Sequence, residues 1–389
     1  MVIGVVGKHI TELGHEILIP ENATVINCQG KFAIPGLWDM HVHLGNASET
    51  SLELFIANGV TGVRDMGSNN LKMLQNWRSE ISLDNRVGPR IITPGPILDG
   101  GTYSKIRVLV NTEMEARHAV DSLAKLGADF IKVHEHLNRE AYLAIADEAS
   151  KLNLSFAGHI PTSGEGYIIS GKEASDLGQT SLEHMLGIPF PGDTIGRHAL
   201  MSTLVNNGTY VTPTLSVYWV MAHREDSSVV HDPRMKYVAP MLREWWQEQM
   251  TEWSRQNKGF RQWLLKARMK MIPVLHSEGV MLLAGTDVGF VYIQPGSGLH
   301  DELAHLVEAG LSPMKAIMTA TINPARYLNR ANELGSIEKG KLADFVILNA
   351  DPIKDIHNTT KISSVIVNGK LFSRKALDEL LIKIEKKSR

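Results

Sequence analysis

The chain has 389 residues, 43% of them hydrophobic and 21% charged, with a formal net charge of -2 at pH 7. That length suits one large domain and a small one, and the near-neutral charge excludes the basic field that nucleic-acid binding requires. No apolar run approaches the roughly 18 to 20 residues of a membrane span, so we expect no membrane partner. The single cysteine, Cys28, cannot form an internal disulfide. With no signal-peptide pattern at the start, we expect a cytoplasmic location.

Both ends of the chain carry short β-rich runs. They lie at residues 2–6, 16–19, 23–27 and 32–34, and again at 340–348 and 362–370, where Asn368-Gly369 marks a hairpin turn. Neither set is large enough to form a core alone. We therefore predict a small β-sandwich domain made of residues 1–35 and 335–389. Because its N-terminal part is short, exposed edge strands would favour contacts in a homo-oligomer.

Residues 36–334 alternate β-rich runs with helical stretches, the pattern of a parallel sheet in an α/β fold. The eight runs are 37–43, 60–65, 90–97, 130–134, 155–159, 181–184, 210–215 and 280–287. Helices are predicted at 51–58, 112–126 and 139–152, each ending near a capping residue. Eight such units in this length predict a (β/α)8 TIM-type barrel.

One connection, residues 217–273, is much longer than the others. It carries five of the seven tryptophans, Trp219, Trp245, Trp246, Trp253 and Trp263. Amphipathic helices are predicted over 243–250 and 258–271. The tryptophans pack the insertion onto the barrel, or they form a lid or pocket wall for an apolar substrate, since barrels keep their active sites at this end of the strands. The sequence leaves both interpretations open.

Metal-ligand side chains stand at five of the strand ends. They are His41, His43, Lys132, His159, His184 and Asp287. Residues two apart on a strand face the same way, so His41 and His43 point to one place. In a barrel all six side chains would face the same mouth. Four imidazoles and a carboxylate suit Zn²⁺ and exceed what one open catalytic site needs, which predicts two divalent ions.

Lys132 is the unusual member of this set. An ammonium group repels cations, and the lysine pKa is ordinarily about 10.4. Reaction of the neutral amine with carbon dioxide would convert Lys132 into a carbamate, an anion able to bridge two ions. This step is a chemical inference from the surrounding residues.

With these residues in this order, the chain resembles the amidohydrolase superfamily in its binuclear form with a carboxylated lysine. The resemblance also includes Pro-Gly-Leu-Trp-Asp-Met-His-Val-His from Pro35 and the segment 335–344. Within the superfamily the chain is most similar to the imidazolonepropionase-like and prolidase-like branch. The segments that carry this similarity are 130–133, 158–161, 213–215, 298–303 and 323–326.

The resemblance implies a role for each ligand. His41, His43 and Asp287 would bind the more buried ion and His159 and His184 the more exposed one, with Lys132 bridging them. A hydroxide between the ions would attack a carbonyl, and Asp287 would carry its proton to the leaving nitrogen. The implied activity is hydrolysis of an amide C–N bond, in a dipeptide or an N-acyl amino acid.

Two further residues are candidates for substrate contact. The resemblance implies that Tyr218 helps hold the carbonyl oxygen. His300 follows the flexible segment 295–298 after the eighth run, so we expect it near the substrate.

Several alternatives remain open. A cyclic amide, an ester or a lactone would suit the same ions, whereas a mononuclear deaminase would not need Lys132. A catalytically inactive barrel scaffold is a different class, which the complete ligand set disfavours. His134 and His136 are either a third ligand set or polar histidines satisfied by neighbours. Arg64 and Asp65 are expected to form a buried pair.

Overall fold

The central strands follow one another around a ring. The computed structural model describes residues 1–45, 49–102, 107–252 and 257–389. The parallel strands are β4 (Leu37–Val42), β5 (Val60–Asp65), β6 (Arg90–Ile92), β9 (Ile131–Val133), β10 (Phe156–Gly158), β13 (Gln179–Glu183) and β14 (Tyr210–Thr212). β4, β5 and β6 form one sheet, and the other four belong to a second. The sheets meet where the amide of Asp129 donates to the carbonyl of Thr93 at 2.9 Å.

Residues 280–287 stand where the eighth strand was predicted, and they form isolated bridges instead of a continuous strand. Leu282 bridges Val211 on β14. On the other side, the amide of Met40 on β4 donates to the carbonyl of Ala284 at 2.9 Å. The ring is thereby closed, which is consistent with the predicted TIM barrel.

Gly285 permits this closure. A Cβ atom at this position would lie 2.6 Å from Thr212 Cγ2 and 2.9 Å from the backbone nitrogen of His41. Only glycine lets the eighth segment come this close to β4 and β14 without displacing them.

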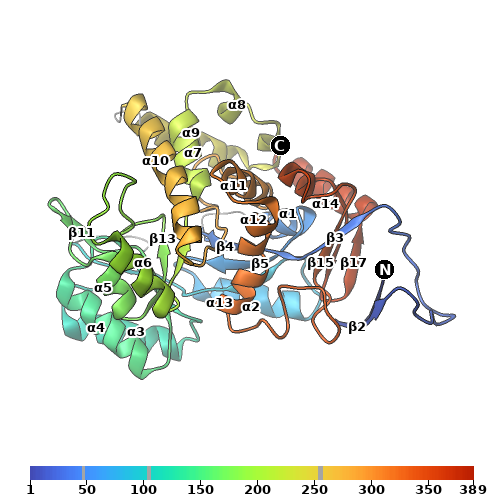
Figure 1. The fold of residues 1–389 in the computed structure, drawn as a ribbon, viewed down its shortest axis with the longest axis horizontal. Coiled ribbons are helices and arrows are strands. Elements are labelled where there is room, and N and C mark those ends of the chain that lie inside the picture. The colour runs from blue at the N-terminus through green and yellow to red at the C-terminus, as the bar shows by residue number, and fades with distance from the viewer. Residues whose placement is uncertain (46–48, 103–106, 253–256) are drawn as a thin grey trace.

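Helices surround the strands (Figure 1). Those of the barrel are α1 (Ser51–Ala57), α2 (Leu71–Ser82), α3 (Glu113–Lys125), α4 (Arg139–Lys151), α5 (Gly171–Asp176), α6 (Arg197–Asn206), α11 (Ser297–Glu308), α12 (Pro313–Thr319) and α13 (Ile322–Tyr327). The three barrel helices predicted from the sequence lie within one residue of α1, α3 and α4. α3 starts where expected because Thr112 and Glu115 form a capping box. Among the described residues no helix is long and apolar enough to cross a membrane.

The long connection folds into α7 (Leu215–His223), α8 (Ser227–Val230), η1 (Pro233–Tyr237), α9 (Pro240–Glu252) and α10 (Lys258–Ser277). α7 and α10 pack against each other (Figure 1). Trp246 is buried against Tyr292, with ring centroids 5.4 Å apart. Trp245 and Trp263, in contrast, are 40% and 49% exposed. The tryptophans thus divide between packing and exposed surface, and Trp253 lies outside the described residues.

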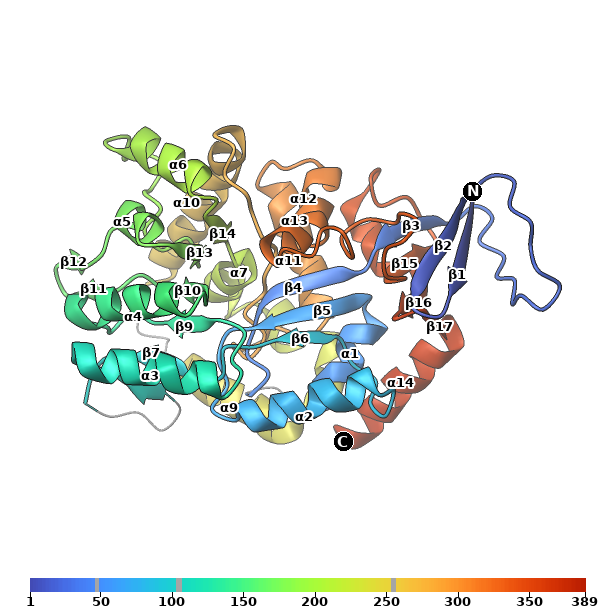
Figure 2. The same ribbon diagram turned by 90° about the horizontal axis from the view of Figure 1, so that it is seen from below.

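The two ends of the chain share one antiparallel sheet in the order β17-β16-β15-β3. Its strands are β3 (Phe32–Pro35), β15 (Phe345–Leu348), β16 (Ile362–Val367) and β17 (Lys370–Ser373). A hairpin of β1 (Val2–Val6) and β2 (His9–Gly14) places Ile10 in a small core with Phe345, Ile347 and Ile366. Figure 2 shows this sheet beside the barrel, with α14 (Arg374–Lys387) below it.

Some sequence predictions for these ends were wrong. Residues 16–19 and 23–27 form no strand, whereas β2 and α14 were not predicted. Residues 16–19 and 23–27 are largely exposed, so the apolar pattern that predicted strands there does not reflect packing against a sheet. The boundaries of a separate small domain at 35 and 335 stay a prediction.

Candidate metal centre

The six predicted ligands come together at the carboxyl ends of the strands. The ring centroid of His41 lies 5.4 Å from that of His43 and 4.6 Å from that of His184. The rings of His159 and His184 are 4.7 Å apart. Oδ1 of Asp287 lies 3.2 Å from Nε2 of His43 and 3.5 Å from Nε2 of His41. Ligand atoms of His41, His184 and Asp287 all lie within 4.8 Å of one another.

Unusual backbone conformations aim these side chains. His184 and Asp287 have φ angles of 57° and 66°, in the left-handed region that residues other than glycine rarely adopt. Such conformations cost roughly 1 to 3 kcal/mol each and concentrate at functional sites. Gly158, with φ of 144°, precedes His159, and a Cβ there would lie 2.1 Å from the carbonyl oxygen of Val133. The chain therefore turns sharply where a predicted ligand leaves its strand.

The imidazoles of His41, His159 and His184 are in the neutral form that metal binding requires. Burial, with the nearby Lys132 charge, lowers the pKa of His41 to about 4. Burial lowers the pKa of His184 to about 3, and that of His159 is also well below its usual value. These three rings are therefore neutral at pH 7, whereas the hydrogen bond to Asp287, against the effect of burial, raises the pKa of His43. Asp287 stays ionised because the neighbouring histidines, against the effect of burial, hold its pKa below the usual range.

Three buried polar atoms in this cluster lack a hydrogen-bond partner within the described parts of the chain. They are Nε2 of His41, Nδ1 of His159 and Nζ of Lys132. A buried polar atom without a partner costs about 1 to 3 kcal/mol, so such an atom ordinarily binds a water molecule or an ion. Burial lowers the pKa of Lys132 to about 8, which makes its neutral amine accessible near pH 7. The donor set and these orphaned atoms fit divalent metal ions.

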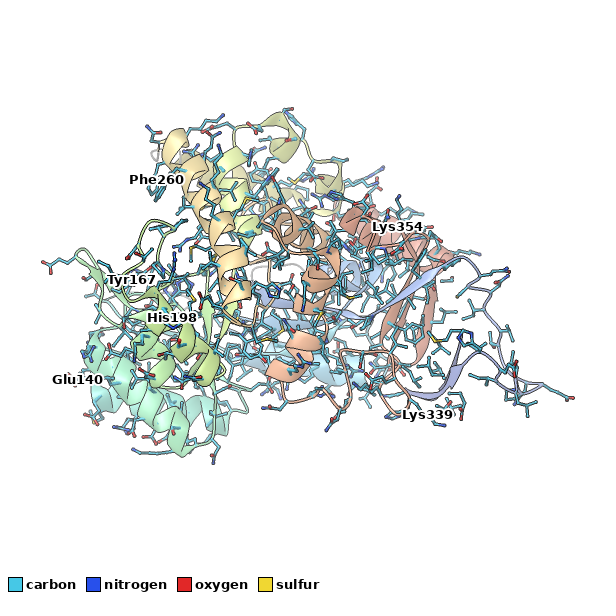
Figure 3. The ribbon with its side chains drawn as sticks, viewed as in Figure 1. Glu140, Tyr167, His198, Phe260, Lys339 and Lys354 are labelled. Carbon is cyan, nitrogen blue, oxygen red and sulfur yellow. The ribbon has the colours of Figure 1, made fainter. Side chains whose placement is uncertain are left out.

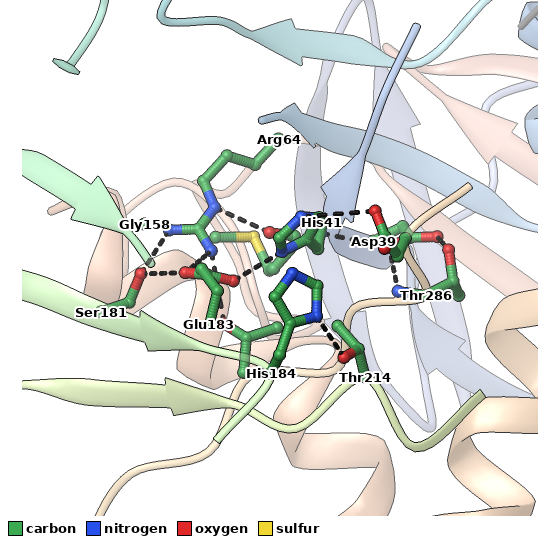
Figure 4. A network of polar contacts seen from close by, with 12 residues as sticks. Asp39, His41, Arg64, Gly158, Ser181, Glu183, His184, Thr214 and Thr286 are labelled. Carbon is green, nitrogen blue, oxygen red and sulfur yellow. Dashed lines mark hydrogen bonds and ion pairs between the residues drawn. The ribbon is translucent and has the colours of Figure 1, made fainter. Parts of the chain in front are cut away.

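Glu183 contacts one of the predicted ligands, although no role was predicted for it from the sequence. Its carboxylate accepts from Nδ1 of His41 at 2.7 Å, from Arg64 at 2.8 Å and from Ser181 (Figure 4). Burial alone would raise the pKa of Glu183, but Arg64 and His41 hold it well below the usual value. Such a contact fixes the tautomer and orientation of His41. An acidic residue at the end of a predicted strand, directly before the predicted ligand His184, was the available signal.

The expected pair of Arg64 with Asp65 is corrected by the structure. Consecutive strand residues point to opposite faces, so Arg64 reaches Glu183 whereas Asp65 faces away. Asp65 accepts from the amide of Leu44 and the hydroxyl of Thr93, both at 2.9 Å. Both residues are fully buried.

Two threonines complete the network around the ligands. Nδ1 of His184 lies 2.7 Å from Oγ1 of Thr214. The hydroxyl of Thr286 donates to Asp39 at 2.7 Å, which ties β4 to the segment that carries Asp287 (Figure 4). These hydroxyls contact residues of distant segments, so the sequence alone could not predict their roles.

His134 and His136 find a protein partner. Their Nδ1 atoms lie 3.2 Å and 3.1 Å from Oδ2 of Asp99, which ends β7 (Ile97–Asp99). Asp99 also pairs with Arg107 on β8 (Arg107–Leu109). A guanidinium in the cluster supports the interpretation of partnered polar histidines over a third ligand set. The ring of His134 stacks on that of His159, with centroids 4.1 Å apart.

The two candidates for substrate contact have different positions. Tyr218 on α7 donates its hydroxyl to the carbonyl of His184 at 2.5 Å, so it lies next to the cluster. His300 is buried elsewhere, with Nδ1 at 3.0 Å from Thr359 and Nε2 at 2.9 Å from the carbonyl of Asn58. The expectation for His300 is corrected accordingly, because both its ring nitrogens join α11 to neighbouring segments.

The chain belongs to the amidohydrolase family, whose model matches residues 32–372. It is 40% identical over 68 residues to an adenine deaminase of Clostridium botulinum (strain Loch Maree / Type A3), a match that covers 18% of this chain and 10% of the deaminase. It is 32% identical over 68 residues to an imidazolonepropionase of Geobacillus sp. (strain WCH70), covering 17% of this chain and 16% of that one. The chain thus spans only a small part of these relatives.

Among solved structures, the fold is similar to that of a Xaa-Pro dipeptidase crystallised with methionine in its active site. The TM-score is 0.74 at 24% identity, and the match covers 95% of this chain and 94% of the dipeptidase. The match extends over both the barrel and the terminal segments, and it is a likeness of fold.

Proposed function

We propose that this chain is a binuclear metal-dependent hydrolase of an amide C–N bond, in a dipeptide or an N-acyl amino acid. The observation that carries the proposal is the convergence of the candidate ligands. Ligand atoms of His41, His184 and Asp287 lie within 4.8 Å of one another, and buried atoms of His41, His159 and Lys132 have no hydrogen-bond partner in the described structure. Membership of the amidohydrolase family supports it.

The ligands divide between two ions in this proposal. His41, His43 and Asp287 would hold the more buried ion, and His159 and His184 the more exposed one. Lys132, as a carbamate, would bridge them. Imidazole and carboxylate donors favour Zn²⁺. Bound ions of this kind polarise a carbonyl and lower the pKa of water to roughly 7.

The protein side chains supply proton transfer and orientation. Asp287 is an ionised carboxylate at the centre of the cluster, so it would accept a proton from the attacking water and deliver it to the leaving nitrogen. The hydroxyl of Tyr218, which donates to the carbonyl of His184 in this structure, would turn to donate to the carbonyl oxygen of the substrate. Glu183 and Thr214 would hold His41 and His184 in place.

Elemental analysis of the purified protein tests the proposal, with Lys132→Ala as the variant and Lys125→Ala, an exposed lysine of α3, as its control. We expect close to two divalent ions per chain in the wild type and the control, and far fewer in Lys132→Ala. One ion unaffected by the substitution would indicate deaminase-type chemistry instead. No ion in any of the proteins would indicate the inactive scaffold.

Substrate screens distinguish the remaining chemistry. Dipeptides and N-acyl amino acids should be cleaved in preference to cyclic amides, esters and lactones, which the same ions could hydrolyse. The homo-oligomer expected from the exposed edge strands is tested separately by light scattering.

A further inference from the structure

Arg268 differs from the other buried arginines of the described structure. Four arginine side chains are 6% exposed or less. Arg64 pairs with Glu183 at 2.8 Å, and Arg224 and Arg261 pair with Glu225 at 3.4 Å and 2.6 Å. Arg268 lies on α10 and is 4% exposed. No carboxylate of the described chain forms an ion pair with it.

The contacts that Arg268 does make leave its charge unbalanced. Its Nη1 donates to the carbonyl of Ile188 at 3.1 Å. The guanidinium carbon lies 4.6 Å from the ring centre of Phe190 and 5.8 Å from that of Tyr218. Nε is buried and has no hydrogen-bond partner in the described structure. Burying an uncompensated charge is unfavourable, and an anion beside the guanidinium would relieve that cost.

This unbalanced cation lies next to the candidate metal centre. Ile188 and Phe190 follow His184 on the loop after β13. Tyr218 contacts the guanidinium with its ring and the carbonyl of His184 with its hydroxyl. A single side chain therefore separates Arg268 from a predicted metal ligand. Burial raises the pKa of Tyr218, and the positive charge of Arg268 opposes that effect.

A row of exposed aromatic rings begins at Phe190, next to Arg268. Phe190, Trp263 and Phe260 are 36%, 49% and 51% exposed. The ring centroid of Trp263 lies 5.0 Å from that of Phe190 and 5.7 Å from that of Phe260, which extends from the end of α10 (Figure 3). A buried cation beside exposed apolar rings suits a ligand with a carboxylate and an apolar side chain.

We propose that Arg268 binds a carboxylate of the substrate and that Phe190 and Trp263 receive an apolar side chain next to it. The preferred substrate is then an amide whose amine half is a hydrophobic amino acid with a free carboxylate. This inference rests on the proposed function for the reaction, but the binding site itself can be tested without turnover.

The test measures binding by calorimetry to the metal-loaded protein. N-methanesulfonyl-leucine is the probe, and its uncharged carboxamide is the comparison, because a sulfonamide resists hydrolysis. We expect the wild type to bind the carboxylate at least tenfold more tightly than the carboxamide. Arg268→Met should bind both within about twofold, and Arg268→Lys should recover part of the preference.

Arg261→Met, a buried and paired arginine on the same helix, is the matched control and should keep the wild-type preference. A wild type that binds both probes equally overturns the inference. So does a preference that survives in Arg268→Met, because the carboxylate would then bind the metal ions. Failure of the proposed function looks different: no amide is hydrolysed, yet the preference that depends on Arg268 remains.

Discussion

Two regions that flank the candidate metal centre differ in whether their buried arginine is paired with a carboxylate. Below the centre, Arg64, Glu183 and His41 form a closed network in which each charge has a partner. Beside it, α10 holds Arg268 between two rings and one carbonyl, with no carboxylate of the described chain to balance it. A fully paired charge serves to position its neighbours, whereas an unpaired one is available to a ligand. Of the four substitutions that follow, Glu183→Gln and Arg268→Met test this contrast, and the other two test how the residues of the candidate centre are held.

The largest effect is expected for Glu183→Gln. The substitution leaves Arg64 buried without a counter-charge, and breaking such a pair costs about 3 to 5 kcal/mol of unfolding free energy. Urea denaturation measures the loss. Glu165→Gln, an exposed position with no ion pair in the described structure, should change it by less than about 0.5 kcal/mol. Equal stability of the two variants would mean that Arg64 does not depend on Glu183.

Gly285→Ala should have the next largest effect. The added Cβ would overlap Thr212 and His41, and overpacking of this kind costs roughly 1 to 3 kcal/mol. Because His41 is displaced, the metal content should also fall, as elemental analysis will show. At Gly164 a Cβ meets nothing within 4 Å, so Gly164→Ala is the control. Normal metal content in Gly285→Ala would contradict the close approach of the two segments.

Thr214→Val removes the contact of 2.7 Å to Nδ1 of His184. Loss of such a support typically weakens metal binding by about 10- to 100-fold, and we expect the lower end of that range. Titration with a competing chelator measures the affinity. Thr359→Val removes a similar contact to His300 away from the centre, and should leave the affinity unchanged. A reduced metal affinity of Thr359→Val would indicate that His300 does contribute to the metal centre.

The smallest effect on stability is expected for Arg268→Met. Removing an unpaired buried charge and keeping apolar volume should leave the unfolding free energy unchanged or raise it by about 1 kcal/mol. Arg261→Met should lower it, because that variant breaks the ion pair with Glu225. Thermal unfolding of both variants provides the comparison. A strong destabilisation by Arg268→Met would assign Arg268 a packing role.

The residues that meet in the candidate centre could be predicted from the sequence because strand periodicity is local. His41 and His43 are two residues apart, and each remaining candidate lies in or directly after a predicted strand. The helices α1, α3 and α4 were predictable for the same reason, since their caps and apolar positions lie within one segment. The sequence therefore determined which residues meet at the mouth of the barrel.

Only the tertiary structure decided how those residues are held. Arg64 and Glu183 are 119 residues apart, and periodicity within either strand says nothing about which charge faces which. The left-handed conformations of His184 and Asp287, and the burial of both nitrogens of His300, likewise arise from packing between distant segments. The lack of a carboxylate beside Arg268 in the described structure is likewise a result of how distant segments pack. Pairing of buried charges depends on the closed barrel, because it is decided between segments that meet only after folding.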